Sequence, residues 1–223
     1  MKVHSHQSSL VLDVSPPSCS QPFMLIIGIV GGIASGKSVV SACFKARGAF
    51  VLDADRAGHE VLRLREIRDQ VRNIWGDSVF QTDGQVDRRK LGQIVFALQG
   101  GETELAKLEA ITHPLIKKRL SEQIEQLRQE EKHPVAILDA PVLFKAGWDG
   151  FCDLILFVES SDENRLNRAT QRGWTRSEFE QREASQVSLE LKRSRSNYVV
   201  VNNDSLESVD HQVDQIWSEL KTT

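Results

Sequence analysis

Residues 31–38 read Gly-Gly-Ile-Ala-Ser-Gly-Lys-Ser and match the pattern G-x-x-x-x-G-K-[ST] at every fixed position. This is the pattern of a loop whose backbone N–H groups bind phosphate. The apolar, strand-like residues 25–30 precede it, and the helix-compatible residues 39–47 follow it. A strand, a glycine-rich turn and a helix in this order predict a phosphate-binding loop, called the phosphate loop below, and disfavour a glycine turn without nucleotide.

The residue types of the phosphate loop predict its chemistry. Gly31 and Gly36 can adopt dihedral angles that a Cβ atom opposes, so successive N–H groups can converge on one anion. The helix that starts near Gly36 adds the positive end of its dipole. Lys37 can reach the β- and γ-phosphates, and the Ser38 hydroxyl can bind Mg²⁺. We expect the methyl group of Ala34 to be accommodated, and ATP or GTP to bind with Mg²⁺.

The composition is that of an ordinary globular protein. The chain has 223 residues, of which 26% are charged and 40% hydrophobic, and its net charge of −3 does not favour a nucleic-acid partner. The three cysteines, Cys19, Cys43 and Cys152, are widely spaced and form no metal or disulfide pattern, which favours a reducing cytoplasm. No apolar run approaches the roughly 20 residues that span a membrane.

Residues 1–23 differ from the rest of the chain. They contain Ser-Pro-Pro-Ser-Cys-Ser and show no sustained periodicity, which predicts a disordered extension. They lack the apolar core of a signal peptide. We expect Met24 to be the physiological start, or the extension to be dispensable, and residues 24–223 to form a single domain.

Five short apolar runs are candidate buried strands. Helix-compatible segments separate them, which predicts an α/β fold with a five-stranded parallel sheet flanked by helices. Ligands of such sheets bind beyond the carboxyl ends of the strands. The runs are residues 25–30, 50–52, 135–138, 154–158 and 198–201.

The stretch between the second and third runs, residues 59–132, is unusually long. A crossover needs only about a dozen residues, so a helical insertion is predicted. Its helices should cover residues 60–74, 88–98 and 104–130. Such an insertion over the carboxyl edge of the sheet would bind the substrate; a purely structural elaboration is the alternative.

Residues 162–195, called the lid segment below, are helix-compatible and strongly basic. Arg165, Arg168 and Arg172 are spaced to lie on one face of a helix. Charged helices usually face solvent, but arginines near a phosphate loop can stabilise negative charge on a transferred phosphoryl group. We therefore expect a mobile basic lid, with Gly173 as its hinge.

Two carboxylates, Asp53 and Asp55, follow the second apolar run and would face the same side in extended geometry. Phosphoryl transfer to a hydroxyl group needs a proton acceptor and carboxylates that bind Mg²⁺, and this pair can supply both. The alternative is a helix or turn cap. Asp139, at the end of the third run, resembles the acid of a Walker B motif.

Taken together, these features resemble the dephospho-CoA kinase family of P-loop kinases. The resemblance spans residues 24 to about 218, with its motifs in the right order. The motifs are residues 31–38, Asp53-Ala54-Asp55 with His59, residues 87–96, His113-Pro114-Leu115-Ile116, residues 139–144, Arg168 with Arg172, then Gln186, Lys192 and residues 198–203.

This resemblance implies transfer of the ATP γ-phosphoryl group to the 3′-hydroxyl of the dephospho-CoA ribose, the last step of coenzyme A synthesis. It implies Asp55 as the general base, with Lys37, Arg168 and Arg172 as further catalytic residues. Ser38 and Asp53 would hold Mg²⁺. The acceptor would contact Asp53, His59, Arg88 and the turn at His113-Pro114. The residues implied in ATP binding are Gly32, Ile33, Ala34, Ser35, Gly36, Lys37, Ser38 and Val39.

Three residues depart from the family pattern. Lys145 stands where Glu is usual, Ala34 replaces a usual Gly, and Val30 stands where Thr usually precedes the glycines. The first and third departures concern the acceptor pocket, whereas Lys37, Ser38 and Asp55 are unaffected. The catalytic assignment is therefore retained.

Two other functions are compatible with the phosphate loop. Another small P-loop kinase, acting on a nucleoside monophosphate or a sugar acid, would share the loop and the lid but not the later motifs. A GTP-dependent switch would need an Asn-Lys-x-Asp motif to read guanine, and the chain has none. The residues alone leave open the oligomeric state and the choice between ATP and GTP.

Overall fold

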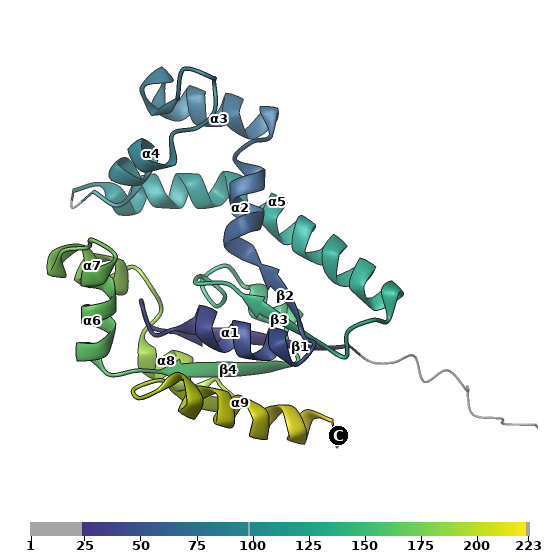
Figure 1. The fold of residues 1–223 in the computed structure, drawn as a ribbon. Coiled ribbons are helices and arrows are strands. Elements are labelled where there is room, and N and C mark those ends of the chain that lie inside the picture. Colours follow the sequence, from purple (N-terminus) through teal and green to yellow (C-terminus); the bar gives the residue numbers. More distant parts are fainter. Residues whose placement is uncertain (1–23, 98, 222–223) are drawn as a thin grey trace, which may run out of the picture.

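Five parallel strands form one sheet in the order β2-β3-β1-β4-β5, with helices on both faces (Figure 1). The computed structural model describes residues 24–97 and 99–221, so the predicted disordered extension, with Cys19, lies outside the described residues. The predicted fold class and all five strands are confirmed. The strands are β1 Leu25–Gly31, β2 Phe50–Asp53, β3 Val135–Asp139, β4 Leu154–Glu159 and β5 Tyr198–Val201.

Strand β1 lies at the centre of the sheet because its side chains are apolar on both faces. Ile26 and Val30 pack into the core on one face, and Ile27 and Ile29 into the core on the other. The strand pairs with β3 on one side and β4 on the other. The phosphate loop therefore leaves the sheet between two neighbouring strands, at the point where ligands of α/β sheets bind.

Two helices cover one face of the sheet, α1 Lys37–Ala46 and α9 Leu206–Leu220. Phe44 of α1 meets Trp217 of α9 edge to face, with 6.3 Å between the ring centroids. Arg47 then joins Asp210 and Asp214 of α9 by ion pairs. This packing fixes the helix that follows the phosphate loop.

The region between β2 and β3 is helical, as predicted, but its first helix is divided. The chain folds into α2 Ala54–Val61 and α3 Arg65–Trp75 in place of one helix over residues 60–74. The apolar spacing of Val61, Ile67 and Val71, all buried, is compatible with a helix and gave no sign of the break. The helices α4 Arg88–Val95 and α5 Gly101–Glu130 follow.

Helix α5 confirms the predicted helix over residues 104–130. The turn that the resemblance implied at His113-Pro114 is wrong, because both residues lie inside this helix. Proline removes one backbone donor from a helix, but α5 is anchored on both sides of it. Thr112 is buried before the proline, and Ile116, Leu120 and Ile124 are buried after it. Tertiary packing here outweighs the local preference of proline.

The lid segment forms three short helices, α6 Asp162–Gln171, α7 Arg176–Ala184 and α8 Leu189–Ser194. Gly173, the predicted hinge, lies between α6 and α7 at a φ of 83°. Thr175 caps α7 through a capping box with Glu178. In Figure 1, α6 and α7 rise from the sheet toward the helices inserted between β2 and β3. None of the helices in the described part of the chain is long and apolar enough to cross a membrane.

Candidate active site

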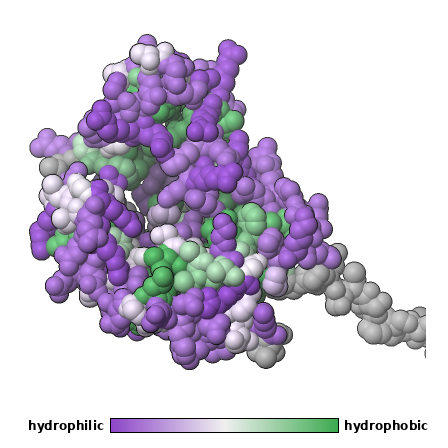
Figure 2. Space-filling view, in the orientation of Figure 1, coloured by the Kyte–Doolittle hydropathy of each residue, from purple (hydrophilic) through white to green (hydrophobic). Residues whose placement is uncertain are grey.

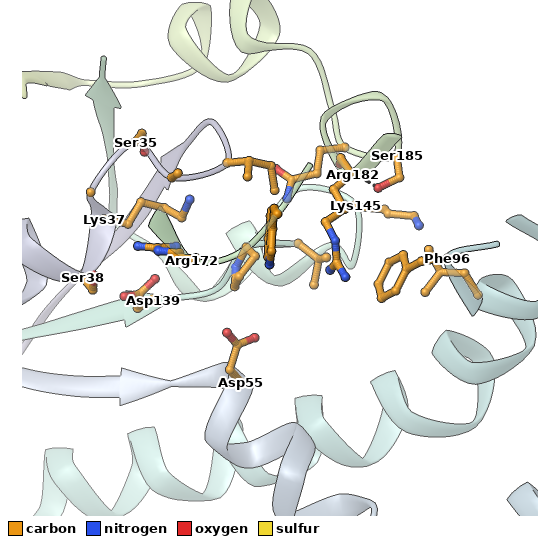
Figure 3. A pocket seen from close by; sticks show the side chains of 18 of the residues that line it. Ser35, Lys37, Ser38, Asp55, Phe96, Asp139, Lys145, Arg172, Arg182 and Ser185 are labelled. Atoms are coloured by element: carbon orange, nitrogen blue, oxygen red, sulfur yellow. Dashed lines mark hydrogen bonds between the residues drawn. The ribbon is translucent and has the colours of Figure 1, made fainter. Parts of the chain in front are cut away.

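A cavity of about 530 Å³ lies between the phosphate loop, the lid segment and the inserted helices. Figure 2 shows the molecule hollowed between these parts. Figure 3 shows that the cavity has two ends. Lys37, Ser38, Arg172 and Asp139 lie at one end, and Arg182, Lys145 and Phe96 at the other, with Asp55 on a third side. The cavity therefore joins the predicted phosphate site to a second compartment.

The phosphate loop has the predicted form. Gly36 caps α1 at a φ of 97°, a left-handed conformation that favours glycine, and a Cβ there would also meet Asn202. The first N–H groups of α1 have no partner within the helix. Residues 33–38 line the cavity, whereas Gly32 and Val39, the ends of the predicted ATP-binding run, are outside the lining that the described residues form.

The side chain of Lys37 folds back onto the phosphate loop. Its Nζ donates to the carbonyl oxygen of Gly32 at 3.0 Å. Burial lowers the pKa of Lys37, while the nearby carboxylates of Asp139, Glu183 and Asp55 raise it. An anionic ligand would compensate the desolvated ammonium group directly, which suits this end of the cavity to phosphate.

The methyl group of Ala34 is accommodated, as expected, but the backbone of this residue is strained. Its φ is 56°, in the left-handed region that L-residues other than Asn and Asp rarely adopt. The methyl group is buried beside Ala169 and Phe179 of the lid segment. The loop therefore tolerates alanine at a cost in backbone energy, partly offset by packing.

The two carboxylates after β2 do not lie in extended geometry, because the chain turns into α2 immediately. Asp53 caps this helix, and its Oδ1 accepts from the N–H of Arg56 at 2.8 Å. Asp55 lies in the first turn of α2 and lines the cavity, whereas Asp53 is not part of the described lining. The cap and the candidate base are thus different residues.

The pKa of Asp55 is raised, first by desolvation and then by the negative charges of Asp53 and Asp139. His59 and Lys37 oppose this shift. A raised pKa makes a carboxylate a stronger proton acceptor. Asp55 therefore lines the cavity with a raised pKa, as a candidate base would.

Asp139 lies at the end of β3 and lines the same cavity. Ser41 Oγ lies 3.1 Å from Asp139 Oδ2, and burial raises the pKa of Asp139 against the opposing charge of Lys37. Among residues 24–97 and 99–221, no group of three or more His, Cys, Asp or Glu is arranged to hold a metal ion. A cation here would depend on one or two protein oxygens and on substrate phosphates, as Mg²⁺ in kinases commonly does.

The three lid arginines have different surroundings. Arg165 is buried and pairs with Asp162 and Glu183. Arg168 donates to the carbonyl oxygens of Ala34 and Ser35, each at 3.3 Å, so its guanidinium binds the outer side of the phosphate loop. Arg172 is exposed and lines the cavity near Lys37 (Figure 3). Only Arg172 of the three faces the predicted phosphate position.

The predicted acceptor residues of the inserted helices lie outside the described lining. His59 Nε2 contacts Arg88 Nη1, which joins α2 to α4. His113 packs edge to face against Trp148, with the ring centroids 5.2 Å apart, and burial lowers its pKa. The structure thus brings His59 and Arg88 together, whereas His113 contacts Trp148.

Sequence reasoning gave no site role to several cavity residues, among them Arg182, Phe96, Trp174 and Glu109. Arg182 lies between the rings of Phe96 and Trp174, with its guanidinium carbon 4.5 and 4.4 Å from their centroids. Glu109 Oε1 accepts from Lys145 Nζ at 2.7 Å. Arg182 falls within the basic lid segment and Phe96 ends the motif at residues 87–96, whereas Trp174 and Glu109 could be placed only from the tertiary fold.

Comparison with known proteins identifies a family. The model of the dephospho-CoA kinase family matches residues 25–208. A dephospho-CoA kinase of Symbiobacterium thermophilum is 38% identical over 196 residues, which are 87% of this chain and 80% of that protein. One of Geobacillus kaustophilus is 39% identical over 193 residues, covering 85% and 93%.

Solved structures agree in fold. A crystal structure of a Thermus thermophilus protein has a TM-score of 0.73 and 33% identity, and covers 88% of this chain and 98% of that one. A dephospho-CoA kinase of Campylobacter jejuni has a TM-score of 0.65 at 22% identity, covering 88% and 97%. The second likeness concerns the fold alone.

Proposed function

Because this chain belongs to the dephospho-CoA kinase family, we propose that it transfers the γ-phosphoryl group of ATP to the ribose 3′-hydroxyl of dephospho-CoA. The observation that carries the proposal is the position of Asp55. Its carboxylate lines one cavity together with Lys37 of the phosphate loop, between the two compartments. Phosphate and acceptor hydroxyl can therefore meet beside a proton acceptor.

The reaction needs one proton acceptor and stabilisation of phosphate charge. Asp55 accepts the proton of the 3′-hydroxyl as the bond from that oxygen to the γ-phosphorus forms. The bond between the γ-phosphorus and the bridging oxygen breaks, and ADP leaves. Lys37 and Arg172 stabilise the negative charge of the transferred group.

Mg²⁺ is the proposed metal of this reaction. The exposed Ser38 hydroxyl and the Asp139 carboxylate both line the phosphate end of the cavity and are oxygen ligands, which Mg²⁺ prefers. When bound with ATP, Mg²⁺ would neutralise phosphate charge. Asp53 as a ligand stays a prediction, since one of its oxygens caps α2. Arg168 acts in this proposal on the loop and not on the phosphates.

The second compartment is the proposed acceptor site. Arg182 and Lys145 bring positive charge to it, and Phe96 and Trp174 bring aromatic surface. A nucleotide acceptor with a pyrophosphate group offers complementary charge and a flat ring. Binding of the acceptor by His59, Arg88 and His113 stays a prediction.

The proposed setting is the cytoplasm, without a nucleic-acid partner. Cys43 is buried and Cys152 half-buried, and both are free thiols. Burial raises the pKa of Cys152 to about 12, which keeps it as a protonated core residue. These thiols and the net charge of −3 support that setting.

The test is ATP consumption by the full-length protein with dephospho-CoA, with AMP, with gluconate, and without an acceptor. Of these acceptors, only dephospho-CoA should give rapid turnover of ATP, and phosphorus NMR should locate the new phosphate on the 3′-oxygen. Lys37→Ala should lose most of this turnover, whereas the surface variant Lys118→Ala should keep it. Equal turnover with AMP or gluconate would contradict dephospho-CoA as the acceptor and support a kinase of nucleoside monophosphates or sugar acids.

A further inference from the structure

The outward carbonyl groups of the phosphate loop are held by side chains from the last third of the chain. Lys192 Nζ donates to the Gly31 carbonyl at 3.1 Å, Arg168 to those of Ala34 and Ser35, and Asn202 Nδ2 to that of Ser35 at 2.8 Å. These bonds fix the peptide planes of the loop, whose N–H groups bind phosphate in such motifs. Lys192 holds the first peptide of this series.

Lys192 is one of the most buried charged residues in the described part of the chain. The residue is 3% exposed, and among the described residues the only other hydrogen bond of its Nζ is to Gln186 Oε1 at 2.7 Å. Among the described residues, no carboxylate oxygen lies within 4.0 Å of its Nζ. A buried cation without an anionic partner is costly to a fold, so its retention requires an explanation.

The charges that face Lys192 come from several elements. Lys37 of α1 and Arg165 of α6 repel its positive charge, and Glu183 of α7 attracts it. Lys145, after β3, lines a small neighbouring cavity with Lys192 but is paired with Glu109. Burial first, and then Lys37, lower the pKa of Lys192 to about 8. Glu183, the carboxylate that attracts Lys192, is also ion-paired with Arg165.

We propose that Lys192 is a positioning residue for nucleotide binding, which holds the phosphate loop at Gly31 and receives its counter-charge from the bound triphosphate. The proposal rests on the proposed function only in that ATP is the nucleotide. It differs from the role of Lys37, because Lys192 lies behind the loop and acts through the Gly31 peptide.

The first experiment compares Lys192→Met with Lys118→Met in the full-length protein. Lys118 is an exposed lysine of α5, paired with Glu122, so it controls for the same chemical change. Lys192→Met should weaken ATP binding about 10- to 100-fold, the range for loss of a hydrogen bond to a charged group. Its Tm should be unchanged or higher, because an unpaired buried charge is gone. A lower Tm with ATP affinity within twofold of the wild type would overturn the proposal.

The second experiment measures proton uptake when ATP binds, by calorimetry at pH 8 in two buffers of different ionisation enthalpy. A group with a pKa near 8 is about half protonated there, so ATP should draw up to about half a proton onto Lys192. The Lys192→Met variant should take up fewer protons on ATP binding than the wild type. The Lys192→Arg variant should bind ATP well but lack the proton uptake that is due to Lys192. Equal uptake by the wild type and Lys192→Met would contradict the proposal.

Two further measures keep the result decisive. If Lys192→Met fails to fold, Lys192→Gln and Lys192→Arg replace it, and loss of ATP affinity only in the glutamine variant supports the proposal; equal affinity in both overturns it. All measurements use ATP without acceptor. A protein that binds ATP as predicted but does not phosphorylate dephospho-CoA would sink the proposed function and leave the role of Lys192 standing.

Discussion

Arg182 of the lid segment lies over the ring of Phe96, which ends α4, with 4.5 Å between the guanidinium carbon and the ring centroid. Trp174 lies 4.4 Å from the same guanidinium. This contact joins the lid segment to the inserted helices across the cavity. Cation–π contacts of this kind are worth roughly 0.5–2 kcal/mol, so the contact can form and break during a catalytic cycle.

Loss of this contact should affect the acceptor more than ATP. Phe96→Ala and Arg182→Ala should each raise the KM for dephospho-CoA by about 3- to 30-fold, given the strength of such contacts. The KM for ATP should change less than about twofold. Steady-state kinetics with either substrate varied measures both. Arg176→Ala is the matched control, because Arg176 is an exposed arginine of the same helix, paired with Glu180; an equal effect there would exclude a specific role of Arg182.

Asp55→Asn should lower kcat by about 100-fold or more, since the amide cannot accept the proton. ATP affinity should stay close to that of the wild type. In the wild type, the acidic limb of the rate profile should follow Asp55, whose pKa lies above its ordinary value of 3.8. Activity is then full above that raised pKa and is lost as the pH falls through it. If the Asp55→Asn variant kept the kcat of the wild type across the pH range, Asp55 would not be the base.

Asp53→Asn should shift the same acidic limb toward lower pH. Asn can still cap α2, but the negative charge that helps to raise the pKa of Asp55 is removed. With a weaker base, kcat at neutral pH should fall only a few-fold, about 3- to 10-fold. A loss as large as that of Asp55→Asn, rescued by high Mg²⁺, would indicate instead that Asp53 is a metal ligand.

Ala34→Gly should stabilise the protein. Glycine removes the strain of a φ of 56°, while the loss of methyl packing and the extra freedom of the unfolded chain offset part of the gain. The expected net increase in the free energy of unfolding is about 0.5–1 kcal/mol, or a Tm about 1–4 °C higher. Thermal unfolding with and without ATP measures it. A lower Tm would mean that the methyl contacts with Ala169 and Phe179 outweigh the strain.

Lys145→Glu should raise the KM for the acceptor by about 3- to 10-fold, because it places a second carboxylate beside Glu109 at the edge of the acceptor compartment. The double variant Lys145→Glu/Glu109→Lys rebuilds the pair with its charges exchanged and should recover most of the affinity. Such a cycle isolates the interaction of the two residues. No recovery in the double variant would show that the charge of Lys145 itself, and not the pair, serves the acceptor.

The fold could be predicted because its decisive signals are local. Each strand is a short apolar run that ends in polar residues, and the phosphate loop carries its own glycines. The helical spacing of residues 104–130 predicted α5, but the break between α2 and α3 could not be read locally, because the buried residues Val61 and Ile67 on its two sides fit one continuous helix. The position of this break depends on tertiary packing.

The candidate site was predictable only in part. The loop and Asp55 are set by motif, and both line the cavity. Asp53 and Asp55 are two residues apart, yet a helix starts between them and separates their roles, which extended geometry did not anticipate. The basic lid segment suggested arginines at the phosphates, but Arg165 and Arg168 contact other protein groups, and of the three only Arg172 lines the cavity.

The order in which the chain is made has a consequence for the phosphate loop. Its residues emerge from the ribosome early, but the side chains that hold its carbonyls, Arg168, Lys192 and Asn202, follow more than 130 positions later. Strand β1 also cannot form its sheet pairing until β3 and β4, its two neighbours, have been synthesised. Such distant contacts form late in folding. A nascent or truncated chain that carries the complete nucleotide motif therefore lacks the contacts that hold the phosphate loop in shape. ATP binding can stabilise only the completed fold.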